Sequence, residues 1–453
     1  MRSTALQAFR SVSRADRVFS HQAERARSAV KVVLACHGVR GDVEPCVVIG
    51  RELLRRGHDV TIAVPPNVVG FAEAAGLTAI SWGGESQVMM DAQRDYWTAL
   101  FQIPWKSNDL GRLGAEIGDI VNACWTAESF STLKSLAETA DLIIAGYGFE
   151  QFPANVAEYY DIPLVTVEFF PTRANGRVLP LLPPPVGRAV MKAYERMSWS
   201  GAVKELENTQ RRELGLPPAT TPWRERITAR GSLEIQAYDV AVVPGLAIEW
   251  AHLGGQRPFV GTLTLESPTD SDAEVASWIA KGTPPIFFGF GSVPVGSPVD
   301  TIAMISRVCE RLGERAVVGA GSTDFSAITT PEHVKVVGLV NFAEVFPLCH
   351  AVVHHSGAGT IAACLRAGVP QVGLWTLPDQ GLRTHQLKRL KVGTGRRFAT
   401  TTEKSLVADL RKVLAPHYVT QARQFASHMT KPAESVAAAI GLVENFVRVG
   451  RAC

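Results

Sequence analysis

Short apolar runs alternate with segments of helical spacing along most of the chain. The first unit has an apolar run rich in β-branched residues at 30–36, a segment of helical spacing at 47–56 and a second apolar run at 58–64. Strand, helix and strand in this order form a β–α–β unit, whose two strands are parallel. The same pattern returns at residues 141–167, so we expect a parallel sheet with helices on both faces.

A linker separates this half from a second series of the same kind. Glycine, proline, serine and threonine are frequent from residue 254 to 272, which is typical of a linker. A strand entering a glycine-rich turn follows at 285–292, and further strands are expected at 316–318, 334–337 and 351–353. Two doubly wound domains in tandem hold a ligand between them, at the carboxyl ends of their strands.

The pattern therefore predicts an α/β protein with two Rossmann-like domains that face a cleft. We place an N-terminal extension at 1–29, the first domain at 30–253, the linker at 254–282, the second domain at 283–431 and a C-terminal helix at 432–453. That last helix is expected to pack back on the first domain. A length of 453 residues fits two domains, and 46% hydrophobic with 20% charged residues is ordinary for a globular core.

Charge, cysteines and hydropathy exclude several classes of protein. A net charge of +3 without a dense basic stripe argues against a nucleic-acid partner. The seven cysteines are scattered and form no Cys-x-x-Cys pair, which argues against a disulfide framework or zinc site and favours the reducing cytoplasm. No apolar run reaches the roughly 18–20 residues that a membrane helix needs.

The first 29 residues are rich in arginine, serine and alanine and lack the apolar centre of a secretory signal peptide. The simplest interpretation is a dispensable extension. Its six arginines could instead attract an anionic membrane surface. We expect a cytoplasmic protein, with peripheral contact at the inner face of the plasma membrane.

The segment 354–363 carries the most informative chemistry. A strand runs into the small-residue turn His355-Ser356-Gly357-Ala358-Gly359-Thr360 and then into a helix. Free backbone N–H groups at a helix start favour an anion, and Gly357 and Gly359 let the backbone approach it. Thr360 adds a hydroxyl donor and His355 a ring donor. We expect a diphosphate cradle without lysine, since neither a Walker loop nor a dinucleotide fingerprint occurs there.

Carboxylates stand at two further points where strands end. Asp379-Gln380 follows the strand after Gly368, and this pair suits vicinal sugar hydroxyls because Asp379 accepts hydrogen bonds and Gln380 both donates and accepts. Asp42 lies in the loop after the first strand, where an α/β fold exposes side chains to its cleft. An aspartate at that point is equally often a helix N-cap, and an isolated Asp-Gln pair is usually a solvated turn.

Taken together, these stretches resemble glycosyltransferase family 1, in the branch of glycopeptide-antibiotic and sterol glycosyltransferases, and in particular the mycobacterial enzymes that build glycopeptidolipids. The resemblance is carried by His-Gly-Val-Arg-Gly-Asp-Val-Glu-Pro at 37–45 and by residues 288–292, 337–341, 354–360 and 379–380. These motifs occur in the same order as in the family, and the resemblance covers almost the whole chain after Val30.

The resemblance implies a GT-B fold, with the acceptor in the first domain and a nucleotide-sugar donor in the second. It implies that Asp42 is the general base. Ser292, His355, Gly359 and Thr360 match positions that hold the donor diphosphate, Val340 and Asn341 match the loop beside the nucleotide base, and Asp379 and Gln380 match the pair that contacts the sugar.

Two positions depart from the family pattern. Ser356 replaces a usual glycine, which the cradle tolerates if this residue does not need a positive φ, as we expect. Ile361 replaces a frequent threonine and removes one hydroxyl from the phosphate site. His37 and His354 are expected to pack against their neighbours rather than to react.

The predicted activity is a metal-independent, inverting hexosyl transfer from a dTDP- or UDP-sugar, with a 6-deoxyhexose as the expected sugar. The expected acceptor is a hydroxyl of a lipid or lipopeptide. No cofactor is expected, and Asp270-Ser271-Asp272, which looks like a metal-binding DxD motif, is interpreted as a solvated linker run. The aromatic and methionine side chains between Trp82 and Trp125 suggest an apolar acceptor groove, although internal packing explains them equally well.

Three alternatives belong to other classes. A nucleotide-sugar epimerase would share the twin-domain fold, but the Gly-Asp-x-x-Pro motif at 41–45 favours transfer to an acceptor. A non-catalytic partner subunit would not need both Asp42 and the Asp379-Gln380 pair. A nicotinamide dehydrogenase would carry the dinucleotide fingerprint that is missing here.

Overall fold

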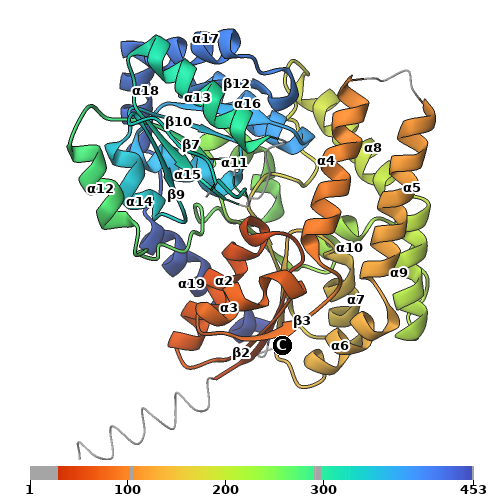
Figure 1. The fold of residues 1–453 in the computed structure, drawn as a ribbon. Coiled ribbons are helices and arrows are strands. Elements are labelled where there is room, and N and C mark those ends of the chain that lie inside the picture. Colours follow the sequence, from red (N-terminus) through yellow and green to blue (C-terminus); the bar gives the residue numbers. More distant parts are fainter. Residues whose placement is uncertain are drawn as a thin grey trace, which may run out of the picture.

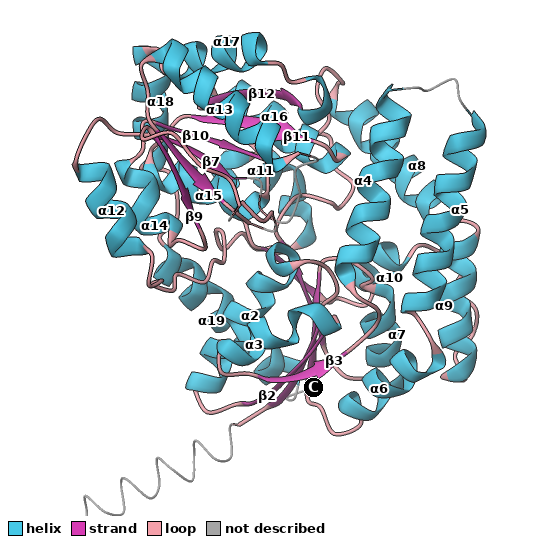
Figure 2. Cartoon of the chain, viewed as in Figure 1, coloured by secondary structure: helices cyan, strands magenta, loops and turns pink. Residues whose placement is uncertain are grey.

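The computed structural model describes residues 29–102, 107–289, 291, 297–321, 323–325 and 327–450. Over these residues the chain forms two six-stranded sheets with helices packed around each of them (Figure 1, Figure 2). The N-terminal extension at 1–28 lies outside the described residues. Within the described part, no helix is long and apolar enough to cross a membrane.

The first sheet has the strand order β3-β2-β1-β4-β5-β6, and all of its neighbouring strands are parallel. Its strands are β1 (Lys31–Ala35), β2 (Asp59–Val64), β3 (Thr78–Ser81), β4 (Leu142–Gly146), β5 (Leu164–Glu168) and β6 (Leu233–Gln236). Every residue of β4 and β5 is buried, because helices cover both faces of the sheet. This explains why these strands are continuous apolar runs rather than alternating ones.

Helices of the first domain cover both faces of its sheet, and one pair of them, α4 and α5, projects from the domain (Figure 1). They are α2 (Arg40–Arg55), α3 (Val69–Ala74), α4 (Ser86–Gln102), α5 (Ser107–Cys124), α6 (Ala127–Ala137), α7 (Gln151–Tyr160), α8 (Pro184–Trp199), α9 (Ala202–Glu213), α10 (Trp223–Ala229) and α11 (Leu246–Trp250). Helices α4 and α5 run side by side, and α4 extends along the edge of the second domain (Figure 1).

The second sheet repeats the topology of the first. Its order, β12-β11-β10-β7-β8-β9, is also parallel throughout and has the same sequence of crossovers. The strands are β7 (Ile286–Gly289), β8 (Ala316–Gly319), β9 (Val334–Val337), β10 (Ala351–His354), β11 (Gln371–Trp375) and β12 (Gly393–Arg397). Both sheets therefore have the doubly wound Rossmann order, and the predicted fold class is confirmed.

The helices of the second half include the two that frame the site, α15 and α16. The set is α12 (Asp272–Ala280), α13 (Pro298–Leu312), α14 (Phe342–Val345), α15 (Ala358–Ala367), α16 (Pro378–Leu390), α17 (Glu403–Val413), α18 (Pro416–Ala426) and α19 (Pro432–Gly450). Helix α19 leaves the second domain and packs on the first. There Ala439, Ile440 and Val443 enter the core, and Glu444 Oε2 lies 3.0 Å from Arg56 Nη1.

The stretch at 254–282 is not irregular throughout. Helix α12 lies within it, and its residues Val275 and Ile279 pack with Phe287 and Val317 in the core of the second domain. The carboxylate of Asp272 accepts hydrogen bonds from the backbone N–H groups of Thr269, at 2.7 Å, and Asn341, at 2.8 Å. Asp272 therefore begins a helix and holds backbone in place with both of its oxygens, whereas Asp270 is exposed.

Candidate active site

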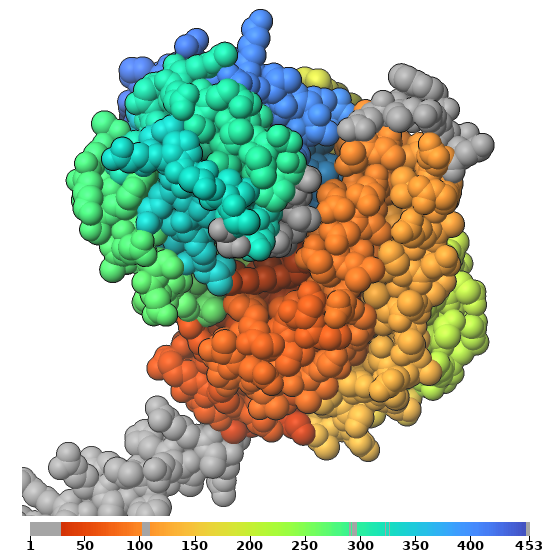
Figure 3. Space-filling model, in the orientation of Figure 1, coloured from red at the N-terminus to blue at the C-terminus, as the bar shows by residue number. Residues whose placement is uncertain are grey.

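The two domains enclose a cleft of about 1300 Å³, which Figure 3 shows as a hollow between the orange first domain and the green-to-cyan second domain. Several of its lining residues follow a strand directly, as Tyr147 follows β4 and His355 follows β10. The described residues predicted for the site all line it: Asp42, Val340, Asn341, His355, Gly357, Gly359, Thr360, Asp379 and Gln380. Ser292 lies outside the described residues.

Asp42 occupies the first turn of α2, where its Oδ2 accepts the N–H of Val39 at 2.9 Å. Among the described residues this is the one hydrogen bond made to its carboxylate. The turn is tight, because a Cβ on Gly38, whose φ is +149°, would lie 2.5 Å from Asp42 Oδ2. Asp42 thus does cap its helix, as an aspartate in this position often does, yet it also lines the cleft.

The surroundings of Asp42 favour a proton acceptor near neutral pH. Burial, assisted by the negative charge of Asp379, raises the pKa of Asp42 to about 6, while the Val39 N–H and the charge of Arg383 oppose the shift. A base with a pKa just below neutrality is ionised at pH 7 and still basic enough to take a proton. This pKa arises from groups of both domains.

His37, just before this turn, is a packing residue. Its Nε2 donates to the carbonyl of Gly84 at 3.1 Å, and its ring lies 4.9 Å from Trp125 and 5.2 Å from Phe149. Burial lowers the pKa of His37 to about 4, so the ring is neutral. It supports the loop that carries Asp42.

The turn between β10 and α15 is organised by His354 and Ser356. His354 is completely buried; its Nδ1 accepts the Ser356 N–H at 2.9 Å and its Nε2 donates to Gln371 Oε1 at 2.8 Å. Ser356 has φ +66°, so the expectation that this residue does not need a positive φ is wrong. The strained backbone is held by hydrogen bonds on each side, including one between Ser356 Oγ and Thr384 Oγ1 at 2.7 Å.

His355 points from this turn into the cleft between two glycines. A Cβ on Gly291 or on Gly357 would lie 2.6 Å from its ring. Its Nδ1 is buried and has no hydrogen-bond partner among the described residues. Burial, and then the charge of Arg383, lower the pKa of His355 to about 4, while a hydrogen bond with the Gly289 backbone opposes the shift, so the ring is neutral.

In the first turn of α15, the N–H groups of Ala358, Gly359 and Thr360 have no acceptor among the described residues. Its N-cap residue is Gly357, which has no side chain to cap these groups, and Gly359 and Thr360 line the cleft beside it. Unpaired N–H groups and the positive end of the helix dipole are the ordinary requirements of a phosphate site. This arrangement suits an anion without a lysine.

Asp379 and Gln380 stand at the start of α16, but they are not equivalent. Gln380 is buried, and its Oε1 accepts the N–H groups of Thr376, at 2.9 Å, and Leu377, at 3.1 Å. Its carbonyl is therefore committed to the helix cap, and the prediction that Gln380 both donates and accepts is corrected to donation alone. The Asp379 side chain is 42% exposed and is free to accept from a ligand.

Arg383 is the residue that the sequence reasoning missed. Its Nη2 lies 2.6 Å from Asp379 Oδ2, and its Nε donates to the Ser356 carbonyl at 2.8 Å. One guanidinium thus joins the cradle turn to α16 and adds a positive charge to the cleft. Arg383 follows Asp379 by four residues, which is the spacing of an ion pair along a helix, and this spacing could have predicted it.

Only part of the aromatic stretch between Trp82 and Trp125 lines the acceptor side of the cleft. Trp82, Met89 and Trp125 are buried in the core of the first domain and cannot line a groove, so that part of the prediction is wrong. Met90 does line the cleft. Trp105 lies outside the described residues.

The far end of α4 makes an aromatic bridge to the second domain. Trp97 stacks on Phe101 at 5.8 Å between ring centroids, and Phe101 meets Trp375 of β11 edge-on at 5.7 Å. Arg397 of β12 donates to the Phe101 carbonyl at 3.0 Å. This contact joins the projecting helix pair to the domain that carries the anion cradle.

Two facing Rossmann-like domains with an anion cradle opposite a carboxylate define a GT-B architecture. Residues 315–442 match the family model described as Erythromycin biosynthesis protein CIII-like, C-terminal domain. An uncharacterized glycosyltransferase of Mycobacterium tuberculosis is 51% identical over 425 residues, which cover 93% of this chain and 100% of the relative. A sterol 3-beta-glucosyltransferase of Arabidopsis thaliana is 29% identical over 373 residues, covering 79% of this chain and 56% of the relative.

Solved structures share the fold. The calicheamicin glycosyltransferase CalG4 superposes with a TM-score of 0.65 at 16% identity, covering 94% of this chain and 99% of that chain. The glycosyltransferase SsfS6 complexed with thymidine diphosphate gives 0.57 at 20% identity, covering 90% and 99%. The chain therefore belongs to glycosyltransferase family 1, and it is an enzyme of the GT-B type.

Proposed function

We propose that this glycosyltransferase moves a 6-deoxyhexosyl group from a nucleotide-diphosphate sugar to a hydroxyl of a lipid or lipopeptide acceptor, with inversion at the anomeric carbon. One observation carries the proposal: Asp42 of the first domain faces the same cleft as the open first turn of α15, and Asp379 and Arg383 lie near enough to act on its pKa. A proton acceptor and an anion site on opposite walls suit direct displacement.

In the proposed reaction, the acceptor hydroxyl gives its proton to Asp42 while its oxygen forms a bond to the anomeric carbon. The bond from that carbon to the diphosphate breaks, and its electron pair leaves with the nucleoside diphosphate. The α15 N–H groups, Thr360 and His355 would stabilise the leaving charge. A single displacement of this kind inverts the configuration.

The donor half of the proposal is supported by the second domain. The SsfS6 structure holds thymidine diphosphate, and the spinosyn rhamnosyltransferase SpnG shares the fold with a TM-score of 0.60 at 16% identity. Asp379 and the Gln380 amide would bind the sugar, and Val340 and Asn341 would lie beside the base. We infer that no metal is needed, because the positive end of the α15 dipole and its backbone N–H groups favour the diphosphate.

The acceptor half is supported by the apolar wall of the first domain. Met90, Phe71 and Phe169 line the cleft on the side of Asp42. An apolar wall beside the base would hold an acceptor whose hydroxyl adjoins a hydrophobic body.

The test is transfer itself. The purified chain is incubated with dTDP- and UDP-sugars and a lipid extract, and products are followed by mass spectrometry and by NMR of the new anomeric centre. We expect a lipid heavier by one deoxyhexose, with the anomeric configuration opposite to that of the donor. A retained configuration would contradict the mechanism. Conversion of the donor to its epimer, without any glycosylated product, would favour an epimerase.

A further inference from the structure

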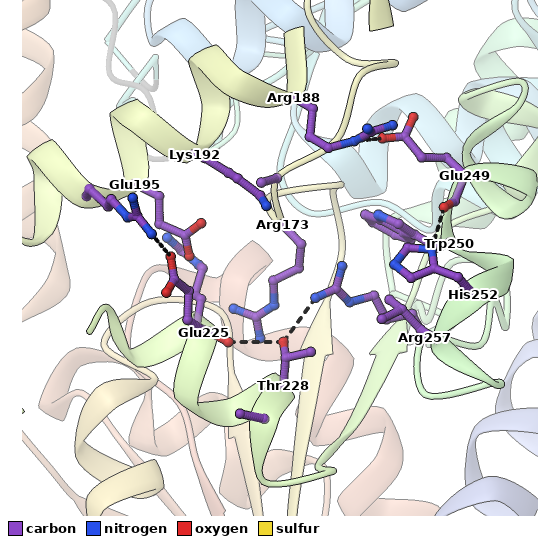
Figure 4. Close-up of a pocket in the computed structure, with 15 residues that line it drawn as sticks. Arg173, Arg188, Lys192, Glu195, Glu225, Thr228, Glu249, Trp250, His252 and Arg257 are labelled. Carbon is purple, nitrogen blue, oxygen red and sulfur yellow. Dashed lines mark hydrogen bonds and ion pairs between the residues drawn. The ribbon is translucent and has the colours of Figure 1, made fainter. Parts of the chain in front are cut away.

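The arginines that line a second cavity, of about 420 Å³, all lie beside carboxylates (Figure 4). This cavity lies on the first domain between α8, α10 and α11. Arg188 Nε, for example, lies 2.9 Å from Glu249 Oε1, and Arg173 Nη1 lies 2.8 Å from Glu150 Oε2. A charge taken out of water is costly unless it is paired. The arginines of this cavity are therefore matched within the fold.

Arg366, near the end of α15, is a partly buried arginine of another kind. Burial lowers the pKa of Arg366, and the charges of Asp239 and Glu266 oppose this shift from beyond ion-pair distance. The hydrogen bonds that its guanidinium makes to described residues all go to uncharged oxygens. The role of Arg366 therefore follows from the segments to which those oxygens belong.

The guanidinium of Arg366 donates to both segments that connect the two domains. The outgoing segment follows Val260, whose N–H donates to a carbonyl of β6, and the returning segment lies between α18 and α19. On the outgoing segment, Nη2 donates to the Thr262 carbonyl at 2.6 Å and Nη1 to Thr264 Oγ1 at 2.9 Å. On the returning segment, Nε donates to the Thr430 carbonyl at 3.0 Å. One planar group thus holds the two segments to α15 and to each other.

The two connecting segments also touch directly. A Cβ on Gly261, whose φ is +81°, would lie 2.5 Å from Ser435 Oγ. Asp239 of the first domain is buried, and its Oδ1 accepts the Thr430 N–H at 2.6 Å. The place where the chain crosses between the domains is therefore a packed, hydrogen-bonded contact.

Glu44 reaches the same contact from the first domain. It lies on α2, two residues after Asp42, and its Oε1 accepts the Leu265 N–H at 2.7 Å. Leu265 follows Thr264, which binds Arg366. All five of these residues line the interdomain cleft. The helix that carries Asp42 and the helix that begins at the anion cradle are thus held to consecutive residues of one segment.

We propose that Arg366 and Glu44 are positioning residues that fix the separation between Asp42 and the first turn of α15 across the cleft. The inference rests on the proposed function, since it takes Asp42 as the base and that turn as the diphosphate site. Direct displacement needs the acceptor oxygen in line with the anomeric carbon, and a misplacement of about 1 Å can cost about 10²-fold in rate. Binding of the nucleotide alone uses groups of the second domain, so it should not depend on this separation.

The first experiment compares kcat with the Kd of dTDP, measured by isothermal titration calorimetry. Arg366→Gln and Glu44→Ala should each lower kcat by about tenfold or more and leave the Kd within about twofold. Glu44→Gln should restore most of the rate, because its amide oxygen can still accept the Leu265 N–H. The double variant of Arg366→Gln with Glu44→Ala should lose less than the product of the two single losses, because both residues act on one segment.

Arg315 of the second domain provides a matched control. Its guanidinium donates to the carbonyls of Trp278, Ile279 and Thr283 at 2.6, 3.0 and 3.0 Å, so it also holds backbone, but within one domain. Burial lowers the pKa of Arg315, as it does that of Arg366. Arg315→Gln should lower the Tm as Arg366→Gln does and leave kcat unchanged.

Double electron–electron resonance measures the separation of the domains without any transfer. The six cysteines of the described chain are buried, so spin labels can be placed at the exposed positions Leu54→Cys on α2 and Val299→Cys on α13, in a Cys453→Ser background. Arg366→Gln and Glu44→Ala should shift or broaden the distribution of distances between the labels, whereas Arg315→Gln should not.

Unchanged kcat in both Arg366→Gln and Glu44→Ala would overturn the proposal, as would an unchanged distance distribution in both. A loss of dTDP affinity as large as the loss of kcat would also overturn it, because Arg366 would then support the donor site rather than the separation. If the wild type transfers no sugar, the proposed function fails, while the distance measurement still decides whether these two residues fix the separation.

Discussion

Asp42→Asn is predicted to slow transfer by about two or more orders of magnitude and at the same time to stabilise the fold. The amide oxygen of asparagine can still accept the Val39 N–H, so the helix cap is preserved. What is lost is the proton acceptor, which typically contributes about 10² to 10⁴ in rate. The free energy of unfolding should rise, because the neutral amide avoids the cost of keeping a charged carboxylate in a partly buried site.

The size of the gain follows from the pKa of Asp42. Burial raises that pKa from 3.8 to about 6, and each unit corresponds to about 1.4 kcal/mol. The full shift would be about 3 kcal/mol, but the side chain is partly exposed to the cleft, so we expect about 1–2 kcal/mol. The folded state binds the proton more tightly than the unfolded chain, so the ionised carboxylate destabilises the fold above about pH 6 and this effect disappears below about pH 4.

The assay combines thermal unfolding with transfer. At about pH 8 the Tm of Asp42→Asn should exceed that of the wild type by about 2–4 °C, and the two should converge toward pH 4. Transfer by the wild type should fall as the pH drops through about 6, because the base becomes protonated.

A matched control exists in the second domain. Asp300 stands in the first turn of α13 and is exposed, so Asp300→Asn removes the same charge without relieving burial and should leave transfer unchanged. Near-normal transfer by Asp42→Asn would remove this residue from the mechanism. A lower Tm at pH 8 would refute the claim that the site penalises the charge.

The remaining predictions concern the turn beside Asp42, the donor site, metal dependence and the bridge between the domains. Gly38→Ala should lower the transfer rate by about tenfold or more, since the new Cβ would displace the carboxylate; an unchanged kcat would show that the turn adapts. Arg383→Lys should raise the donor KM more than it lowers kcat, because an ammonium cannot join both Ser356 and Asp379; an unchanged donor KM would contradict this. Transfer should survive EDTA, whereas a loss that manganese restores would indicate a metal. Trp97→Ala removes one ring of the bridge between α4 and the second domain, so it should raise the acceptor and donor KM together, whereas a rise in the acceptor KM alone would place Trp97 at the acceptor.

The domain plan was determined by the sequence itself. Alternating apolar runs and helical segments predicted the strands because burial on both faces of a parallel sheet requires continuous apolar residues, as in β4 and β5. Such patterns are local, so they can be interpreted without knowing which elements become neighbours. For the same reason, residues just beyond a strand, such as Asp42 and His355, could be assigned to the cleft.

What each side chain does in that cleft was decided by the tertiary structure. Ser356 tolerates its positive φ because Thr384 and Arg383, on α16, hold it. Gln380 cannot accept from a ligand because its carbonyl caps its own helix. Trp125 lies in the core, although the aromatic composition of the stretch around it suited an acceptor groove equally well.

The pKa of Asp42 shows most directly why the role of a side chain could not be predicted from the sequence. Its largest cause is burial, and Asp379 and Arg383, more than three hundred residues further along the chain, contribute opposite charges. Desolvation and charge pairing depend on distances between elements from both domains, and no local pattern encodes those distances. The sequence alone therefore predicted the two-domain plan, most of the strands and every candidate residue except Arg383, whereas β3, β6 and β12 were not predicted. Only the assembled fold decided which of those residues is a base, a cap or a packing side chain.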